Sequence, residues 1–217
     1  DNPLILLDAE APEEGFAHDP DDHAYSAGLF HGEPVGIAMD VLKIAVAEVG
    51  SLSERRLFRL TTGTLSQRLP PGLARHDRPE LGLMLPQTTA AALVSENKAL
   101  GWPASMDSIP TCEDQEDHVA MSTTAARRAA EVLVNTRRII AIELLGAAHA
   151  LAFRREADEH LVLGAGTRPA LSTLEATLDG FRGDRAPADD IALLDQLLMG
   201  EGLFVGLPTL LHVGESP

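Results

Sequence analysis

The sequence is poor in cysteine, aromatic residues and basic residues. The single cysteine, Cys112, excludes an internal disulfide framework and fits a reducing compartment, so the expected location is the cytoplasm. Aromatic residues make up only 4% of the chain, so the core must be built from Leu, Ile, Val and Ala, which suits closely packed helices. The 17 basic residues are outnumbered by 33 acidic ones, and the resulting net charge of -16 argues against binding to nucleic acid or to an anionic membrane surface.

Long apolar runs are also missing. The most apolar stretch, IIAIELLGAAHALAF, is broken by Glu143 and His149 and is too short for a membrane span, so we expect no membrane segment. The acidic loop around His18 and His23 matches no zinc or calcium ligand spacing, so we expect no metal site. Because the sequence opens with DNPLILL rather than Met, we expect a fragment or a processed subunit.

Hydrophobic periodicity predicts an all-α protein with three long helices and two shorter ones. Their expected bounds are Val35 to about Leu60, near Pro86 to Gly101, about Gln115 to Leu151, about Pro169 to Leu178, and about Asp189 to Met199. Short connections between long helices imply an elongated bundle. Helices of this length present more apolar surface than one small chain covers, so we also expect oligomerisation.

Two of these helices carry an apolar stripe. On the first helix the stripe repeats at a spacing near 3.6 residues, and we expect it to be buried: Ile37, Val41, Ile44, Ala45, Val49 and Leu52. On the third helix the stripe contains small residues that let neighbouring backbones approach closely: Val119, Ala126, Ala130, Leu133, Ile140, Leu144, Ala147 and Leu151.

The stretch CEDQEDHVAM, residues 112–121, gathers four carboxylates and a histidine ahead of the third helix. Asp114 and Asp117 resemble a variant capping box, and an acid in a first helical turn contributes about 0.3 to 1 kcal/mol through the helix dipole. Capping does not account for Gln115 and Glu116. Two interpretations therefore stay open: the acids cap a helix, or one of them faces a substrate.

Several segments resemble, in order and spacing, the carboxy-terminal half of the histidine ammonia-lyases. They are SAGLFHGEPV, LPPGL, AALVSENKAL, WPASMDSIPT and QEDHVAMSTTAAR. The wider family includes phenylalanine and tyrosine ammonia-lyases and related aminomutases. The opening DNPL and the later GDRAPADDI fit the same family. The resemblance is strong from residue 1 to about 155 and weaker to about 200, so we divide the chain into a bundle part, 1–155, and a helical tail, 156–217.

The resemblance implies a long-helix bundle of the fumarase and aspartase type that assembles as a homotetramer. It also implies a methylidene-imidazolone (MIO) prosthetic group, which the family makes by cyclising an internal Ala-Ser-Gly. This chain holds no such tripeptide: Ser26-Ala27-Gly28 has another order, and Ala104-Ser105 is followed by Met106. The amino-terminal part that carries it is the expected partner. Without that part, the chain alone is expected to be inactive.

The resemblance also implies site residues. Asn2 matches an asparagine near the substrate carboxylate, and Phe30 matches a phenylalanine beside the substrate ring. Glu116 falls where histidine-specific members have glutamate, which can hold an imidazole by a charge-assisted hydrogen bond. Gln115 and Met84 match neighbouring pocket positions, although a methionine at helical spacing is also typical of core. The implied reaction removes ammonia from an aromatic amino acid, L-histidine giving urocanate.

The sequence departs from the family pattern at several positions. Leu29 replaces an asparagine, and CED at 112–114 replaces Ser-Ala-Asn. Glu80 and Leu81 replace Asn-Ser before the second helix, and Pro86 is unusual there. Two alternatives therefore stay open: a non-catalytic helical scaffold derived from a lyase, and a lyase or aminomutase for another aromatic amino acid.

Overall fold

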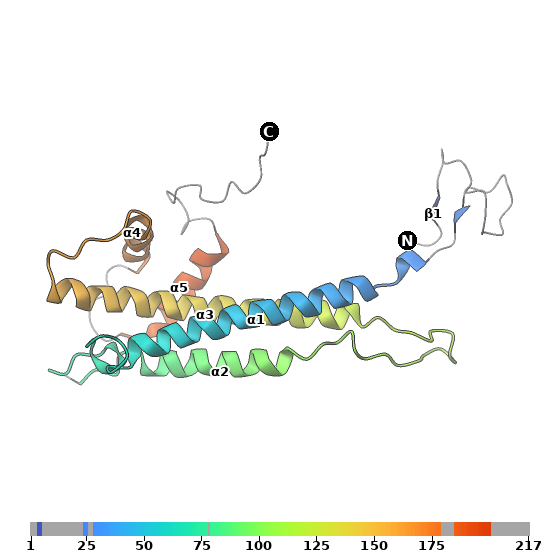
Figure 1. Cartoon of the computed structure of the whole chain (residues 1–217), viewed down its shortest axis with the longest axis horizontal. Coiled ribbons are helices and arrows are strands. Elements are labelled where there is room, and N and C mark those ends of the chain that lie inside the picture. Colours follow the sequence, from blue (N-terminus) through green and yellow to red (C-terminus); the bar gives the residue numbers. More distant parts are fainter. Residues whose placement is uncertain (1–3, 6–23, 26–27, 78, 179–184, 201–217) are drawn as a thin grey trace. The chain divides into compact units, whose positions relative to one another are not determined.

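The computed structural model describes residues 4–5, 24–25, 28–77, 79–178 and 185–200, and these residues are almost entirely helical. The helices are α1 (Glu33–Thr61), α2 (Met84–Leu100), α3 (Ser122–Ala157), α4 (Thr167–Thr177) and α5 (Pro187–Met199), with 3-10 turns at Gly28–Phe30 and Pro71–Leu73 (Figure 1). The only sheet among the described residues pairs β1 (Leu4–Ile5) with β2 (Ala24–Tyr25) in antiparallel register. The predicted all-α fold class is confirmed.

The chain divides into two compact units. Unit 1 comprises 1–42 and 103–129, and unit 2 comprises 43–102 and 130–217. The division of the sequence at residue 155 stays a prediction. None of the helices in the described part of the chain combines the length and the apolar character that a membrane span requires.

The core of unit 2 is aliphatic. One cluster joins the residues after α1 to the second half of α3 and to the two short helices: Leu69, Leu73, Leu83, Ala141, Leu145, Ala148, Ala150, Leu174, Leu178 and Leu194. A second cluster joins α1, α2 and α3: Leu57, Ala90, Val94, Ile139 and Ile142. Both clusters are built from the residue types that the composition predicted.

Small and polar residues allow the three long helices to approach closely in unit 2. A Cβ added to Gly146 would lie 2.5 Å from Leu57 Cδ1, so α3 packs tightly on α1 at this point. Thr136 Oγ1 on α3 donates to the Val46 carbonyl of α1 at 3.2 Å and accepts from Asn97 Nδ2 of α2 at 3.1 Å. One hydroxyl therefore connects all three helices.

The prediction that the apolar stripe of α1 is buried is wrong. Ile37, Val41, Ile44, Val49 and Leu52 are each 48 to 63% exposed. The buried face instead carries one large apolar residue, Leu57, and otherwise small or polar residues: Gly36, Asp40, Lys43, Gly50, Ser53 and Glu54. Burial of these polar residues is possible because each finds a specific partner, as described for several of them below.

Two predictions for α3 are also wrong. The helix begins at Ser122 rather than near Gln115. Its buried face is displaced by about one residue from the predicted stripe and includes Ala125, Ala129, Val132, Thr136, Ile139, Ile142 and Gly146. Leu133, a member of the predicted stripe, is 54% exposed. Apolar residues cover much of this helix, so the spacing alone does not select one face.

Candidate functional site

Residues 111–116, in unit 1, form a closed turn. Thr111 and Glu116 exchange two backbone hydrogen bonds, of 3.1 and 3.2 Å, and form an isolated antiparallel bridge. Between them, Cys112, Glu113 and Asp114 have φ angles of +53°, +56° and +67°. Such angles place these residues in the left-handed region, which a right-handed helix cannot include.

The helix-capping interpretation of the acidic cluster is therefore wrong. α3 has no acidic residue in its first turn, and Met121, directly before it, has a φ of +50°. Asp114 lies inside the closed turn, and Asp117 lies in the irregular segment that follows it. The acids belong to the loop that precedes α3, and the last of them, Asp117, lies five residues before Ser122.

Glu116 lies at the closing position of this turn. Its backbone N–H and its carbonyl both form hydrogen bonds with the backbone of Thr111, whereas its side chain is exposed. Among the described residues no hydrogen bond or ion pair involves its carboxylate. Gln115 is also exposed, and its backbone N–H donates to the Cys112 carbonyl at 3.1 Å. The turn therefore presents a carboxylate and an amide on a fixed piece of backbone.

Two histidines bring the segment of Phe30 to the segment of Glu116. His31 Nε2 lies 3.2 Å from the carbonyl oxygen of His118, and the two rings stack with centroids 5.2 Å apart. Phe30 directly precedes His31 and is 63% exposed. The structure thus places Phe30, Gln115 and Glu116 on segments that meet in unit 1, and Asn2 lies outside the described residues.

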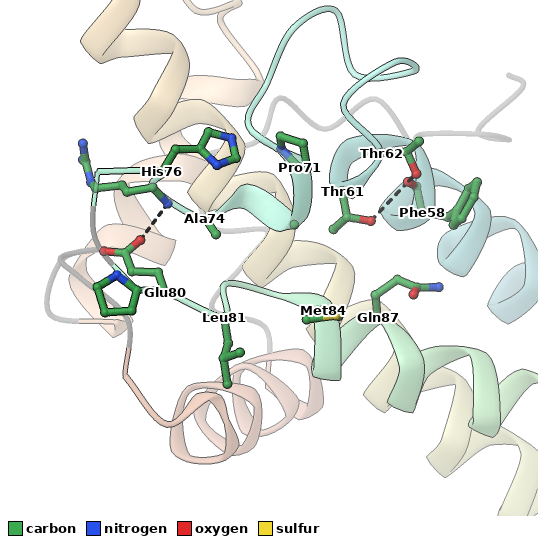
Figure 2. Close-up of a pocket in the computed structure, with 13 residues that line it drawn as sticks. Phe58, Thr61, Thr62, Pro71, Ala74, His76, Glu80, Leu81, Met84 and Gln87 are labelled. Carbon is green, nitrogen blue, oxygen red and sulfur yellow. Dashed lines mark hydrogen bonds between the residues drawn. The ribbon is translucent and has the colours of Figure 1, made fainter.

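Met84 belongs to unit 2, where it lines a cavity of about 530 Å³ between the end of α1, the α1–α2 connection and the start of α2. Figure 2 shows Met84 and Gln87 on α2 beside Phe58, Thr61 and Thr62 of the α1 end. Met84 is 54% exposed, so it is not a core methionine in this chain.

A buried carboxylate supports the wall of this cavity. Glu54 is 2% exposed and accepts hydrogen bonds from Gln87 Nε2 at 2.8 Å and from the Arg55 guanidinium at 2.5 and 2.7 Å. Burial raises the Glu54 pKa, but the hydrogen bonds from Arg55 and Gln87, together with the positive charges of Arg55 and Lys98, outweigh burial and leave the pKa below its usual range.

A second carboxylate joins α3 to α1. Glu143 accepts from Ser53 Oγ at 2.6 Å and from two nitrogens of Arg56 at 2.5 and 2.7 Å. The paired carboxylate raises the pKa of Arg56 further above its ordinary value. Glu143 and Glu54 are thus structural acids, whereas Glu116 is the exposed acid of the predicted site.

The described residues do not form the implied prosthetic group. The sequence contains one Ala-Ser pair, Ala104-Ser105, and a methionine follows it. Ala104 is buried, and the Ser105 backbone N–H donates to Asp40 Oδ2 at 2.8 Å. This segment serves to anchor the loop on α1. Within the described part of the chain, no cluster of three or more His, Cys, Asp or Glu suits a metal ion.

Sequence reasoning missed the contacts that fix these residues. His31 and His118 are 87 positions apart, and the sequence offers no signal that pairs them. The same holds for Gln87 and Glu54, which are 33 positions apart.

Comparisons with known proteins agree with this architecture. The sequence model described as "Aromatic amino acid lyase" matches residues 1–176. The histidine ammonia-lyase of Symbiobacterium thermophilum is 48% identical over 198 residues, covering 91% of this chain and 36% of that protein. The crystal structure of histidine ammonia-lyase from Trypanosoma cruzi superposes with a TM-score of 0.82 at 38% identity, covering 96% of this chain and 39% of that one. Phenylalanine aminomutase from Pantoea agglomerans superposes with a TM-score of 0.78 at 30% identity, covering 94% of this chain and 37% of its own.

The chain therefore spans little more than a third of the length of the relatives it matches.

Proposed function

The chain belongs to the aromatic amino acid lyase family, and we propose that it is the carboxy-terminal segment of a histidine ammonia-lyase that converts L-histidine to urocanate and ammonia. The observation that carries the proposal is the presence of an exposed glutamate at position 116. The QED stretch, which resembles the family motif, lies in a chain 48% identical to a histidine ammonia-lyase, and the glutamate side chain is exposed at the end of a closed turn.

The proposed task of Glu116 is to bind and orient the substrate ring. A carboxylate accepts hydrogen bonds, and an imidazole N–H donates one, whereas a phenyl ring offers no donor. A charge-assisted hydrogen bond of this kind contributes about 1.5 to 3 kcal/mol. Glu116 therefore favours histidine over phenylalanine by a hydrogen bond that only histidine can make.

The other predicted residues complete the binding surface. The exposed ring of Phe30 offers an apolar face on which an aromatic substrate can pack, and Gln115 offers an amide beside Glu116. Asn2 is proposed to contact the substrate carboxylate, and Met84 to contribute to the pocket. In the assembled enzyme these contacts hold the substrate in one orientation, which is the contribution of this chain to the rate.

The elimination itself requires groups that this chain does not supply. A β-hydrogen of an amino acid is a very weak acid, so removal of ammonia needs an electrophile that activates the amine and a base placed at the β-carbon. In the family the electrophile is the MIO group formed from Ala-Ser-Gly, a tripeptide absent from these 217 residues. We propose that another polypeptide segment supplies it, and that this chain alone is inactive.

The exposed stripe of α1 supports an assembly with further polypeptide. Ile37, Val41, Ile44 and Leu52 occupy one side of the helix, and each is at least half exposed. An apolar surface of this kind marks an interaction site in a soluble protein. We propose that the Ala-Ser-Gly-bearing segment and further copies of this chain cover the stripe in a homotetramer located in the cytoplasm.

Reconstitution tests the proposal. The chain is expressed alone and together with an Ala-Ser-Gly-bearing amino-terminal part, taken from the same gene or from a separate chain, and urocanate is followed by its ultraviolet absorbance. We expect no urocanate from the chain alone and a steady increase from the assembled pair. The control replaces the serine of Ala-Ser-Gly by alanine, which should abolish the increase. An assembled tetramer with an intact Ala-Ser-Gly that acts on no aromatic amino acid would refute the proposal in favour of a scaffold.

A further inference from the structure

The tautomer of His31 is fixed by its two neighbours. The Glu33 backbone N–H lies 3.3 Å from His31 Nδ1, and because an amide nitrogen only donates, Nδ1 must be the unprotonated acceptor. The ring proton then resides on Nε2, which lies 3.2 Å from the carbonyl oxygen of His118 and donates to it. The His31 ring thus links the start of α1 to the segment that follows Glu116, with one hydrogen bond at each ring nitrogen.

The contacts of His118 are consistent with the same tautomer. Its Nε2 lies 3.4 Å from the Glu33 carboxylate, which accepts, so Nε2 carries the proton. Its Nδ1 lies 3.2 Å from Ser108 Oγ. That hydroxyl accepts from the Val119 backbone N–H at 3.0 Å and therefore has its own proton free to donate to Nδ1. Each donor in this series has one acceptor, and all five contacts are mutually consistent.

The network joins the beginning of α1 to both sides of the acidic turn. Glu33, the first residue of α1, uses its backbone N–H for one ring and its carboxylate for the other. Ser108 precedes the turn and His118 follows it, two residues after Glu116. The stacked rings lie 17° from parallel, which restricts sliding of one segment along the other.

The exposure of the network argues for a geometric role rather than a stabilising one. The His118 side chain is 52% exposed and the Glu33 side chain 26% exposed. Hydrogen bonds and ion pairs with this access to water contribute little to stability. These hydrogen bonds do restrict the orientation of the segments that they join, however. A carboxylate that binds a ring nitrogen must be held in the correct orientation.

We propose that His31 and His118, both in the Nε2-protonated form, are positioning residues that hold the turn 111–116 so that the Glu116 carboxylate faces the substrate ring. This inference rests on the proposed function of Glu116. It assigns to the two histidines no contact with the substrate and no proton transfer.

A double-mutant cycle in the reconstituted enzyme tests the functional part. His118→Phe keeps a stacking ring and removes both hydrogen bonds, and we expect kcat/KM for L-histidine to fall about tenfold. In a Glu116→Gln background the same change should cause no further loss, because the group that His118 positions is already gone. Equal losses in the two backgrounds would mean a general structural role and would overturn the proposal.

Replacements at His31 separate the hydrogen bond from the ring. His31→Gln retains an amide donor for the His118 carbonyl and should keep kcat/KM within about threefold of the parent, whereas His31→Phe should lower it about tenfold. His160→Phe, at a histidine that is 88% exposed and remote in sequence from the network, is the matched control and should leave kcat/KM unchanged. If Gln and Phe at position 31 behave alike, the directional hydrogen bond has no role.

Nitrogen-15 NMR of the histidine rings tests the tautomers without any activity. In the 217-residue chain labelled with ¹⁵N-histidine, above pH 7, we expect protonated Nε2 and unprotonated Nδ1 for both His31 and His118, assigned with the two Phe variants. A protonated Nδ1 in either ring would overturn the network even if a variant fails to fold. If Glu116→Gln leaves histidine turnover unchanged, the proposed function itself fails, and the positioning role fails with it.

Discussion

Gly82 offers a stability test whose magnitude follows from two separate features of its surroundings. Its φ is +57°, in the left-handed region, and a Cβ at this position would lie under 3.0 Å from the Gly72 carbonyl oxygen. That carbonyl accepts a hydrogen bond from the Leu83 N–H at 2.7 Å, just before α2. Gly82→Ala therefore strains the backbone and also displaces a hydrogen-bonded carbonyl next to the Met84 cavity.

The two costs can be estimated separately. The left-handed conformation costs a non-glycine residue about 1 to 2 kcal/mol. Displacing the Gly72 carbonyl weakens one hydrogen bond, worth about 0.5 to 1.5 kcal/mol, and adds steric strain of similar size. We therefore expect Gly82→Ala to lower the free energy of unfolding by about 2 to 5 kcal/mol.

Two further glycines provide matched controls. Gly72 has a φ of +66°, but its nearest neighbour to an added Cβ is 3.7 Å away, so Gly72→Ala should show the backbone cost alone, about 1 to 2 kcal/mol. Gly164 has neither feature, since its added Cβ meets only Thr167 Oγ1 at 3.7 Å. Gly164→Ala should be neutral or stabilising by up to about 1 kcal/mol, because alanine restricts the unfolded chain.

Urea unfolding of the three variants supplies the measurement. With a slope of about 2 to 3 kcal/mol per molar urea, Gly82→Ala should lower the midpoint by about 1 to 2 M at an unchanged slope. Equal midpoints for Gly82→Ala and Gly72→Ala would refute the steric argument. A Gly82→Ala midpoint equal to that of Gly164→Ala would refute both arguments.

Three other predictions concern unit 2. Gly146→Ala should lower the free energy of unfolding by about 1 to 3 kcal/mol because its Cβ would meet the buried Leu57, and the midpoint of urea unfolding checks this value. Thr136→Val should cost about 1 to 3 kcal/mol, since it leaves the buried Asn97 amide without its acceptor, whereas Thr136→Ser should cost less than 1 kcal/mol in the same assay. Folding lowers the Glu54 pKa, so the ionised carboxylate stabilises the protein at pH values above the unfolded pKa of about 4.3, and this contribution is lost as the pH falls through the lower folded pKa. Glu54→Gln should therefore flatten the dependence of the unfolding free energy on pH below about 4.3. A curve for the variant that runs parallel to that of the parent would contradict this.

The helices were predictable because periodicity and prolines act locally. The predicted end of the first helix at about Leu60 agrees with its observed end at Thr61, and the start of α2 at Met84 lies within two residues of Pro86. The start of α3 was not predictable, because acids before a helix fit a cap equally well. Only the left-handed angles of residues 112–114 exclude that interpretation.

The buried face of α1 was not predictable from hydrophobicity. Lys43, 1% exposed, is buried because its Nζ donates to the Trp102 carbonyl at 2.8 Å, a contact 59 residues away in sequence. Ser53 is buried because it donates to Glu143, 90 residues away. Long-range partners of this kind decide which polar residues can be buried, and a single sequence does not contain them.

Of the candidate site, Glu116 and Phe30 were found by resemblance, and His31 and His118 required the structure. The exposed apolar stripe of α1 was likewise only partly predictable, because its spacing predicts that another surface packs on it but does not identify that surface. What covers it is expected to be polypeptide outside this chain.

The most direct test of the account is the specificity of the reconstituted enzyme with and without the Glu116 carboxylate. We predict that Glu116→Gln lowers kcat/KM for L-histidine about 10- to 100-fold, equivalent to the loss of one charge-assisted hydrogen bond, and does not lower it for L-phenylalanine. Glu113→Gln, at an exposed acid of the same turn, is the control and should leave both values unchanged. Unchanged histidine turnover in Glu116→Gln, with an altered rate for another amino acid, would contradict the central claim.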